Sequence, residues 1–381
     1  MNKKIQLVLS YILVAALSAI ITLQLTPQKE TTKLEQLLEI IRYYYVEDVD
    51  MTAVEDAAAD AIINSLSDRW SYYIPASTYA SYLERAHNAY VGIGVTILTR
   101  EDAQGFDVIA VEESGPAYEV GIQPGDRVIG VEGQDVTGMT ATDVRNLVRG
   151  EEGTYVMITI LRNGEELEFK IERRELQVVV AEGMLLEDNI GLVVIYDFDD
   201  RCAEESIAAI ESLREQGAEK LIFDVRFNSG GYAHEMVTLL DYLLPAGDLF
   251  RTVNYAGKES VDTSDADYLD MPMAVLVNAE SYSAAELFAA ALQEYEAAKV
   301  VGQKTSGKGY YQNVFTLVDG SAVSLSTGKY VTPLGVSLEG VGITPDVVVE
   351  LDQETEAGVY YGTLTPEEDP QIQAAIEALS K

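Results

Sequence analysis

Two residues of this 381-residue chain, Ser283 and Lys308, have the side chains needed to hydrolyse an acyl bond together. Ser283 follows an apolar, strand-like run at 274–278 and begins an amphipathic, helix-like run. Lys308 lies in the glycine-containing loop 303–312, directly after the next strand-like run at 299–302. In an alternating α/β sheet, the carboxyl ends of such strands meet at one edge. The spacing therefore predicts a hydrolase in which a neutral lysine activates a serine.

Each member of this pair also has an ordinary structural interpretation. Ser283 and Glu286 form a capping-box pattern at a helix start, and Lys308 could be a solvated loop lysine. Ser281 is a weaker candidate for the nucleophile. The chemical interpretation requires an uncharged amine near pH 7, which burial beside the tyrosines that follow the lysine would favour.

Histidine is too scarce here to make a serine–histidine–aspartate triad attractive. Only His87 and His234 occur, and the sequence has no Gly-x-Ser-x-Gly motif. His234 follows a glycine pair and begins a helix-like run, a position typical of a surface or capping group. Lysine is therefore the better candidate for the base.

A third element, residues 224–231, ends a buried strand-like run with the glycine pair Gly230–Gly231. Glycines at such a turn leave main-chain N–H groups uncovered, and these groups can hold an oxyanion. The first N–H groups of the helix after Ser283, beginning at Ala284, point toward the same chemistry. The alternative interpretation is a simple tight turn.

Two patterns suggest cofactors but fail in detail. Gly302 and the pair Gly307–Lys308 have the spacing of a phosphate-binding loop, but Gly309 stands where the magnesium-binding Ser or Thr belongs. The acidic run 262–270 lacks the glycine and the terminal glutamate of a calcium loop. We therefore expect no nucleotide, no metal and no cofactor.

Composition restricts the possible partners. The apolar fraction of 48% is enough for a substantial core, and the formal net charge of −37 argues against nucleic acid as a partner. The single cysteine, Cys202, cannot form an internal disulfide, so we expect a buried structural thiol.

The N-terminus predicts an exported protein. Lys3 and Lys4 precede an uncharged apolar run at 5–25, which as a helix would be about 31 Å long, close to the thickness of the bilayer core. The leading positive charge predicts a cytoplasmic tip with everything after the anchor outside. A signal peptide cleaved near 16–18 is the alternative, and it exports the same domains.

Four segments follow the anchor region 1–29. Residues 30–89 show helical periodicity, 90–175 read as a small barrel-like domain of short strands, 176–350 alternate strand and helix, and 351–381 are acidic with a final helix at 370–379. The helical stripes near both ends could pack on the core or on a second copy of the chain, which allows a homodimer.

Taken together, the segments resemble the carboxyl-terminal processing (tail-specific) proteases of the S41 peptidase family, over nearly the whole chain after the anchor. The run 90–95 resembles the opening of that family's PDZ domain, and 224–231 resembles its Asp-Leu-Arg-x-Asn-x-Gly-Gly motif. Residues 277–286 match its nucleophile segment, and 340–346 its closing motif. The sequence departs from the family pattern at several positions: Val225, Phe227, Tyr282, Ala285 and 334–337, where an arginine is often found.

The resemblance implies specific roles for residues of this chain. Ser283 would be the nucleophile, Lys308 the base, and Gln312 the group that orients the amine. The oxyanion hole would be formed by Ala284 and the glycine pair, with Gly230 preferred over Gly231. The carboxylate of a bound protein tail would be held by the PDZ loop of Val91, Gly92, Ile93, Gly94 and Val95.

We therefore expect an α/β (α+β) protein with a membrane helix, a helical segment, a β-rich PDZ domain and a protease core of ClpP/crotonase-like type. Its function would be that of a membrane-anchored serine endopeptidase that recognises protein substrates by their exposed C-terminal tails. The rival interpretations are a catalytically inactive PDZ scaffold and, less well supported, an ATP- or GTP-binding protein.

Overall fold

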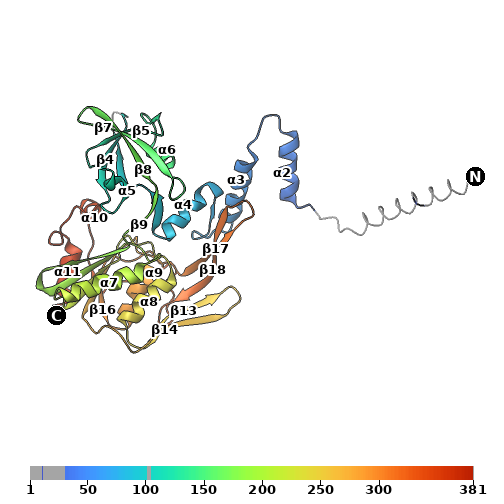
Figure 1. Cartoon of the computed structure of the whole chain (residues 1–381). Coiled ribbons are helices and arrows are strands. Elements are labelled where there is room, and N and C mark those ends of the chain that lie inside the picture. The colour runs from blue at the N-terminus through green and yellow to red at the C-terminus, as the bar shows by residue number, and fades with distance from the viewer. Residues whose placement is uncertain (1–10, 12–30, 101–103, 381) are drawn as a thin grey trace, which may run out of the picture. The chain divides into compact units, whose positions relative to one another are not determined.

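The computed structural model describes Tyr11 and residues 31–100 and 104–380 (Figure 1). Apart from Tyr11, the expected membrane span at 5–25 lies outside the described residues. Within the described ranges, no helix combines the length and the apolar character needed to cross a bilayer. The chain divides into two compact units, Met1–Ser67 and Asp68–Lys381.

The described part of the first unit after residue 30 contains the helices α2 (Lys33–Tyr44) and α3 (Met51–Asn64). Thr32 begins α2 with a reciprocal cap: it accepts the Glu35 N–H, and the Glu35 carboxylate accepts the Thr32 N–H. Arg42 of α2 pairs with Glu55 of α3 at 3.2 Å. No side chain of either helix is buried, so the apolar stripe of α2 remains exposed.

The second unit starts with elements that lead into the larger sheets. These are strand β1 (Tyr72–Ile74), helix α4 (Ala76–Ala86) and a two-stranded ribbon of β2 (Ala89–Gly92) with β9 (Arg174–Gln177). Strand β2 ends at Gly92, and the first strand of the next sheet begins at Val95. The break falls at Ile93–Gly94, where Gly94 has a φ of 75° that favours glycine.

A small antiparallel sheet follows, with the order β3-β4-β5-β7-β8 and β6 paired to β5. Its core contains the inward-facing residues of alternating strands, such as Val156, Ile158 and Ile160 on β7. The elements are β3 (Val95–Thr99), β4 (Phe106–Val111), α5 (Pro116–Glu119), β5 (Arg127–Val131), β6 (Gln134–Asp135), α6 (Ala141–Val148), β7 (Tyr155–Arg162) and β8 (Glu165–Glu172).

The main sheet has the order β10-β11-β12-β15-β16-β19, and all of its pairings except β10–β11 are parallel. Alternation between strand and helix therefore predicted this sheet correctly. Its strands are β10 (Ala181–Leu185), β11 (Ile190–Ile195), β12 (Lys220–Asp224), β15 (Met273–Val277), β16 (Ala298–Gly302) and β19 (Val347–Val348). The short 3-10 helix η1 (Glu187–Asn189) connects β10 to β11.

Helices cover both faces of this sheet (Figure 1). Phe223 and Val275 point into a core shared with α7 (Cys202–Glu215), α8 (Ala233–Leu243) and α9 (Ala284–Glu294). Their neighbours Ile222 and Ala274 point the opposite way, against α11 (Pro370–Ala378). Because the middle strands are buried on both sides, their sequences are almost continuously apolar.

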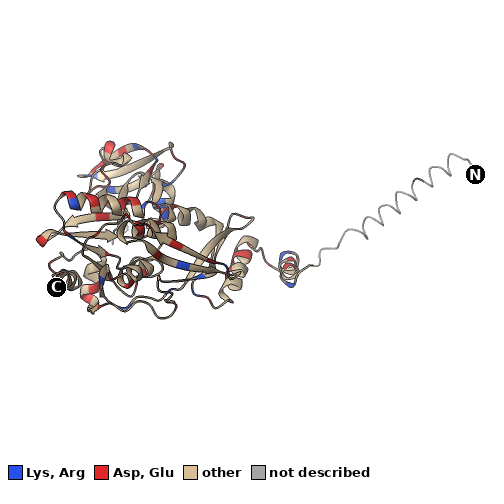
Figure 2. Ribbon diagram, turned by 90° about the horizontal axis from the view of Figure 1, so that it is seen from below, with Lys and Arg blue, Asp and Glu red and all other residues tan. Residues whose placement is uncertain are grey.

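A third sheet completes the unit, with the order β1-β18-β13-β14 and β17 paired to β18. Its remaining strands are β13 (Gly247–Asn254), β14 (Glu259–Ser264), β17 (Tyr310–Thr316) and β18 (Ala322–Val331), and helix α10 (Gln353–Tyr360) precedes α11. Acidic residues are spread over helices and strands of the described chain (Figure 2). Cys202 is free and fully buried, as expected.

Candidate active site

Ser283 lies on the turn that joins β15 to α9, and its backbone is strained. Its φ of 62° and ψ of −122° are unusual for a residue with a side chain, and conformations of this kind cost about 1–3 kcal/mol. The turn is held by the Glu286 carboxylate, which accepts the Ser283 N–H at 3.1 Å. Strain of this kind often accompanies a functional group that must project from its element.

Ser281, the weaker candidate, has a structural role. Its side chain is fully buried. The hydroxyl donates to the Val225 carbonyl at 2.7 Å and accepts the Asn278 N–H at 3.0 Å. These bonds connect the nucleophile turn to the loop after β12, which leaves Ser283 as the serine available for chemistry.

Lys308 follows β16, and its amine lies among aromatic rings. The Nζ atom is 4.9 Å from the centre of the Trp70 ring and 5.8 Å from that of Tyr282. Burial lowers the pKa of Lys308 from its ordinary value of 10.5 to about 8, although the negative charges of Glu286, Asp68 and Glu339 oppose that shift. A substantial fraction of neutral amine is therefore present at mildly alkaline pH.

Ser283 and Lys308 line the same cleft, which has a volume of about 1210 Å³. Gly230, Ala284 and Gln312 line it as well. The loops that carry these residues leave the carboxyl ends of the parallel strands β12, β15 and β16 or follow from them. Aromatic side chains dominate the rest of the wall: Trp70, Tyr72, Tyr79, Tyr82, Tyr282, Tyr311 and Tyr330.

Glu286 joins the two loops, and its side chain is completely buried. Besides the Ser283 N–H, its carboxylate accepts the N–H groups of Lys308 at 2.9 Å and Gly307 at 2.7 Å, and the Thr305 hydroxyl at 2.5 Å. Burial nevertheless raises the pKa of Glu286 above its usual range. The capping-box interpretation was therefore incomplete, because the same carboxylate fixes the loop of the lysine against the loop of the serine.

The expected oxyanion donors lie directly against the serine. A Cβ atom on Gly230 would come within 2.7 Å of the Ser283 Cβ and 3.0 Å of the Ala284 nitrogen. The Gly230 N–H, however, already donates to Asn228 Oδ1 at 2.8 Å, and the Asn228 side chain is tied to the Ile195 carbonyl. Gly231 sits so close to the backbone of 198–199 that a Cβ atom there would be 2.3 Å from a carbonyl carbon.

We expect Gly230→Ala to reduce turnover by at least about 100-fold, the scale of losing one oxyanion donor. The φ of 92° disfavours alanine, and the added methyl group must displace Ser283 or Ala284. Initial rates on an unfolded polypeptide measure the effect. Gly335→Ala is a suitable control, because that glycine also has positive φ but open space around it. Equal losses in the two variants would show that backbone strain alone is responsible.

Gln312 lies on the part of β17 that borders the cleft. Its Nε2 group donates to the Tyr310 carbonyl at 3.1 Å and to the Ser326 hydroxyl at 3.0 Å. Both N–H donors of the amide are thereby used. Its oxygen is left as the group that can accept a hydrogen bond from an amine.

Tyr330 is a site residue that the sequence did not reveal. It is buried on β18, and its hydroxyl donates to the Lys308 carbonyl at 2.6 Å. Burial raises the pKa of this phenol, so the hydroxyl stays protonated. No motif indicates this role, because β18 follows Lys308 across a hairpin and its register is decided by tertiary pairing.

The expected tail-binding loop lies beside a separate pocket in the small antiparallel sheet. Val91, Gly92, Ile93, Gly94 and Val95 line a pocket of about 460 Å³. Apolar residues of α6, among them Val144 and Val148, form its opposite wall. A strand edge facing a helix across an apolar groove is suited to bind an extended peptide as an added strand.

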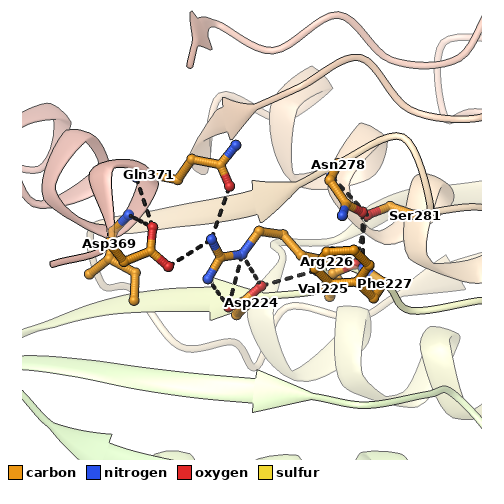
Figure 3. Close-up of polar contacts among 9 residues, drawn as sticks. Asp224, Val225, Arg226, Phe227, Asn278, Ser281, Asp369 and Gln371 are labelled. Carbon is orange, nitrogen blue, oxygen red and sulfur yellow. Dashed lines mark hydrogen bonds and ion pairs between the residues drawn. The ribbon is translucent and has the colours of Figure 1, made fainter. Parts of the chain in front are cut away.

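A buried ion cluster centred on Arg226 lies next to the segment that carries the glycine pair (Figure 3). Arg226 makes a bidentate pair with Asp224, with bonds of 2.6 and 2.9 Å, and reaches Asp369 at 2.8 Å and the Gln371 oxygen at 2.9 Å. Its pKa is raised, because the two carboxylates outweigh the effect of burial. The next residue, Phe227, donates its N–H to Asn278 Oδ1 at 2.9 Å. The start of α11 is thus connected to the segment that carries the glycine pair.

The fold and site define a serine hydrolase built on a parallel sheet, with a second domain that has a peptide-binding groove. Models of known families agree: that of peptidase family S41 matches residues 189–349, and a PDZ domain model matches 108–162. A "Probable CtpA-like serine protease" of Staphylococcus haemolyticus (strain JCSC1435) is 34% identical over 333 residues, covering 86% of this chain. Its counterpart in Staphylococcus aureus (strain COL) is 30% identical over 344 residues, covering 89%.

The chain belongs to peptidase family S41, and the expectation of a serine-type peptidase is confirmed at the level of the family. It spans 66% of the length of the first of these relatives and 69% of the second. An S41 protease structure from Bacteroides fragilis NCTC 9343 shares the fold, with a TM-score of 0.50 and 14% identity, over 91% of this chain and 97% of that one.

Proposed function

We propose that this chain is a membrane-anchored serine endopeptidase that cleaves protein tails with a Ser283–Lys308 pair assisted by Gln312. The observation that supports it best is that both side chains line one cleft, where burial brings the Lys308 amine to a pKa of about 8. An inactive PDZ scaffold would need neither feature.

In the first step, the neutral Lys308 amine removes the Ser283 proton while the serine oxygen attacks the substrate carbonyl. The negative charge that develops on the carbonyl oxygen is stabilised by the Ala284 N–H and by the glycine pair. The Gly230 N–H can stabilise this charge only after it breaks its hydrogen bond to Asn228 Oδ1. The Gly231 N–H does not have to break that bond. The protonated lysine then passes its proton to the leaving amine.

Deacylation follows the same path in reverse. A water molecule gives its proton to Lys308 and attacks the acyl-enzyme, and the lysine returns the proton to Ser283. Gln312 accepts a hydrogen bond from the amine through its free oxygen and thereby keeps the amine directed at the serine. Tyr330 holds the Lys308 backbone in place from β18.

Substrate selection belongs to the PDZ domain. The loop 91–95 would bind the free carboxylate of an extended tail with main-chain N–H groups, and the tail would lie along the strand edge. The apolar run 5–25 behind Lys3 and Lys4 would anchor the chain with its catalytic part on the extracytoplasmic side. The exposed stripe of α2 would pair with a second copy of the chain.

A polypeptide substrate with a free or an amidated C-terminus tests this function. We expect amidation to lower kcat/KM by about tenfold to 100-fold, because a charge-assisted set of hydrogen bonds is lost. The change should appear mainly in KM, since the scissile bond is unaltered. Equal kcat/KM values for the two substrates would refute tail recognition while leaving the peptidase chemistry standing.

A further inference from the structure

The turn Asp68–Ser71, directly before β1, lies against the proposed base although the site motifs do not include it. The Trp70 ring faces the Lys308 amine at 4.9 Å and the Tyr282 ring at 5.8 Å. The Arg69 guanidinium stacks on Trp70 at 4.0 Å from the ring centre. The turn thus forms one wall of the pocket that lowers the polarity around the amine.

A carboxylate fixes the shape of this turn. Asp68 accepts the Trp70 N–H at 3.0 Å and the Ser71 hydroxyl at 2.6 Å. The Ser71 hydroxyl also accepts the Ser326 N–H of β18 at 2.9 Å. Asp68 therefore holds Ser71, and Ser71 holds Ser326.

Ser326 of β18 also fixes Gln312, the residue expected to orient the Lys308 amine. The Ser326 hydroxyl accepts a hydrogen bond from Gln312 Nε2 at 3.0 Å. The sequence of bonds runs from Asp68 through Ser71 and Ser326 to Gln312, and it sets which face of the Gln312 amide is left for Lys308.

Four charged groups from three parts of the fold act on Lys308: Glu286 from α9, Glu339 from the loop after β18, and Asp68 and Arg69 from the turn. Glu286 and Glu339 are committed to main-chain N–H groups of the lysine's own loop. Asp68 acts from a separate segment. Burial would raise the pKa of Asp68, but its hydrogen bonds and the charge of Lys308 hold that pKa below its ordinary value, so the group is an anion at neutral pH.

We propose that Asp68 is a positioning residue of the catalytic apparatus, which aligns Gln312 through Ser71 and Ser326 and supplies a fixed negative charge to Lys308. This inference rests on the proposed function, because it assumes that Lys308 is the base. It assigns a role in catalysis to a turn that lies more than 200 residues before the nucleophile in the chain.

The test is the rate at which a fluorophosphonate probe labels Ser283 between pH 6 and 10, in wild type and in Asp68→Asn. Labelling requires the serine to be activated but does not require a tail to bind. Without the Asp68 charge, the ammonium form of Lys308 is less favoured. We therefore expect the acid limb of the pH–rate profile, the range over which the labelling rate rises with pH, to move to lower pH by about half a unit to one unit. The plateau should fall about tenfold as Gln312 loses its alignment.

Two further variants separate the two effects. Ser326→Ala breaks the connection but keeps the charge, so its plateau should fall while its acid limb stays at the wild-type position. Asp319→Asn removes a similar turn-forming aspartate, one that is bonded to Ser321 at the hairpin tip away from the cleft, and it should change neither. Thermal melts confirm that each variant is folded.

An unmoved acid limb in folded Asp68→Asn would overturn the proposed charge, and a plateau equal to that of wild type would overturn the alignment. The Lys308→Met variant tests the assignment of Lys308 as the base separately. If Lys308→Met labels at the wild-type rate at every pH, Lys308 is not the base and the inference falls with it.

Discussion

Replacing Lys308 with methionine is expected to reduce turnover by about 10⁴-fold, and Ser283→Ala should reduce it at least as much. Methionine keeps an unbranched stem that can pack against Trp70 and Tyr282, so the fold should persist while the proton acceptor is lost. The double variant should be no slower than the worse single variant, because both residues serve one step. Turnover of an unstructured polypeptide measures all three.

The neighbouring loop lysine provides the control. Lys304 is exposed and does not line the cleft, so Lys304→Met should leave turnover within about a factor of two. A Lys308→Met enzyme that turns over at a rate close to that of wild type at pH 7 would contradict the role of the lysine as base.

The second large effect concerns stability. Arg226→Met should lower the free energy of unfolding by about 3–5 kcal/mol, because it leaves two buried carboxylates, Asp224 and Asp369, without their cation. Arg226→Lys should recover only part of the loss, since an ammonium cannot make the bidentate pair. Urea denaturation monitored by circular dichroism gives both values.

Arg214→Met is the matched surface control for that experiment. Its pair with Glu211 is exposed on both sides, and such pairs contribute about 1 kcal/mol or less. If Arg226→Met were no more destabilising than Arg214→Met, the buried cluster would not be holding α11 to the main sheet. Activity should fall together with stability in Arg226→Met, because Phe227 and the glycine pair follow directly in the chain.

The main sheet was predictable because its signals are local. Strand-like runs are expected at 274–278 and 299–302, and the structure has β15 at Met273–Val277 and β16 at Ala298–Gly302. The helix expected at 370–379 is α11, within one residue of the expected bounds. Short periodic segments between clear turn residues decide their own structure.

Other elements depended on partners distant in the sequence. Strand β14 is mostly polar and overlaps the acidic run 262–270, which no alternating pattern marks as a strand, but it pairs with β13. Helix α10 lies in a stretch read only as acidic. Neither segment has a period that competes with its polar composition, so tertiary pairing and capping decide its structure.

The candidate site divides in the same way. A serine turn and a lysine loop that each follow a strand of one parallel sheet could be expected at one cleft, and Ser283 and Lys308 both line it. Tyr330, Asp68 and the link between Arg226 and Asp369 could not, because each contact joins segments that only the folded chain brings together. The engagement of the Gly230 N–H by Asn228 is a side-chain detail that no motif contains.

The central claim is that a lysine made partly neutral by burial activates Ser283. The most direct measurement is the rate constant for labelling of Ser283 by the fluorophosphonate probe in wild-type protein, as a function of pH. A rate that rises with pH through a single midpoint near 8, the pKa of Lys308, is the predicted result. A rate independent of pH, or a midpoint near the ordinary lysine value of 10.5, would contradict it.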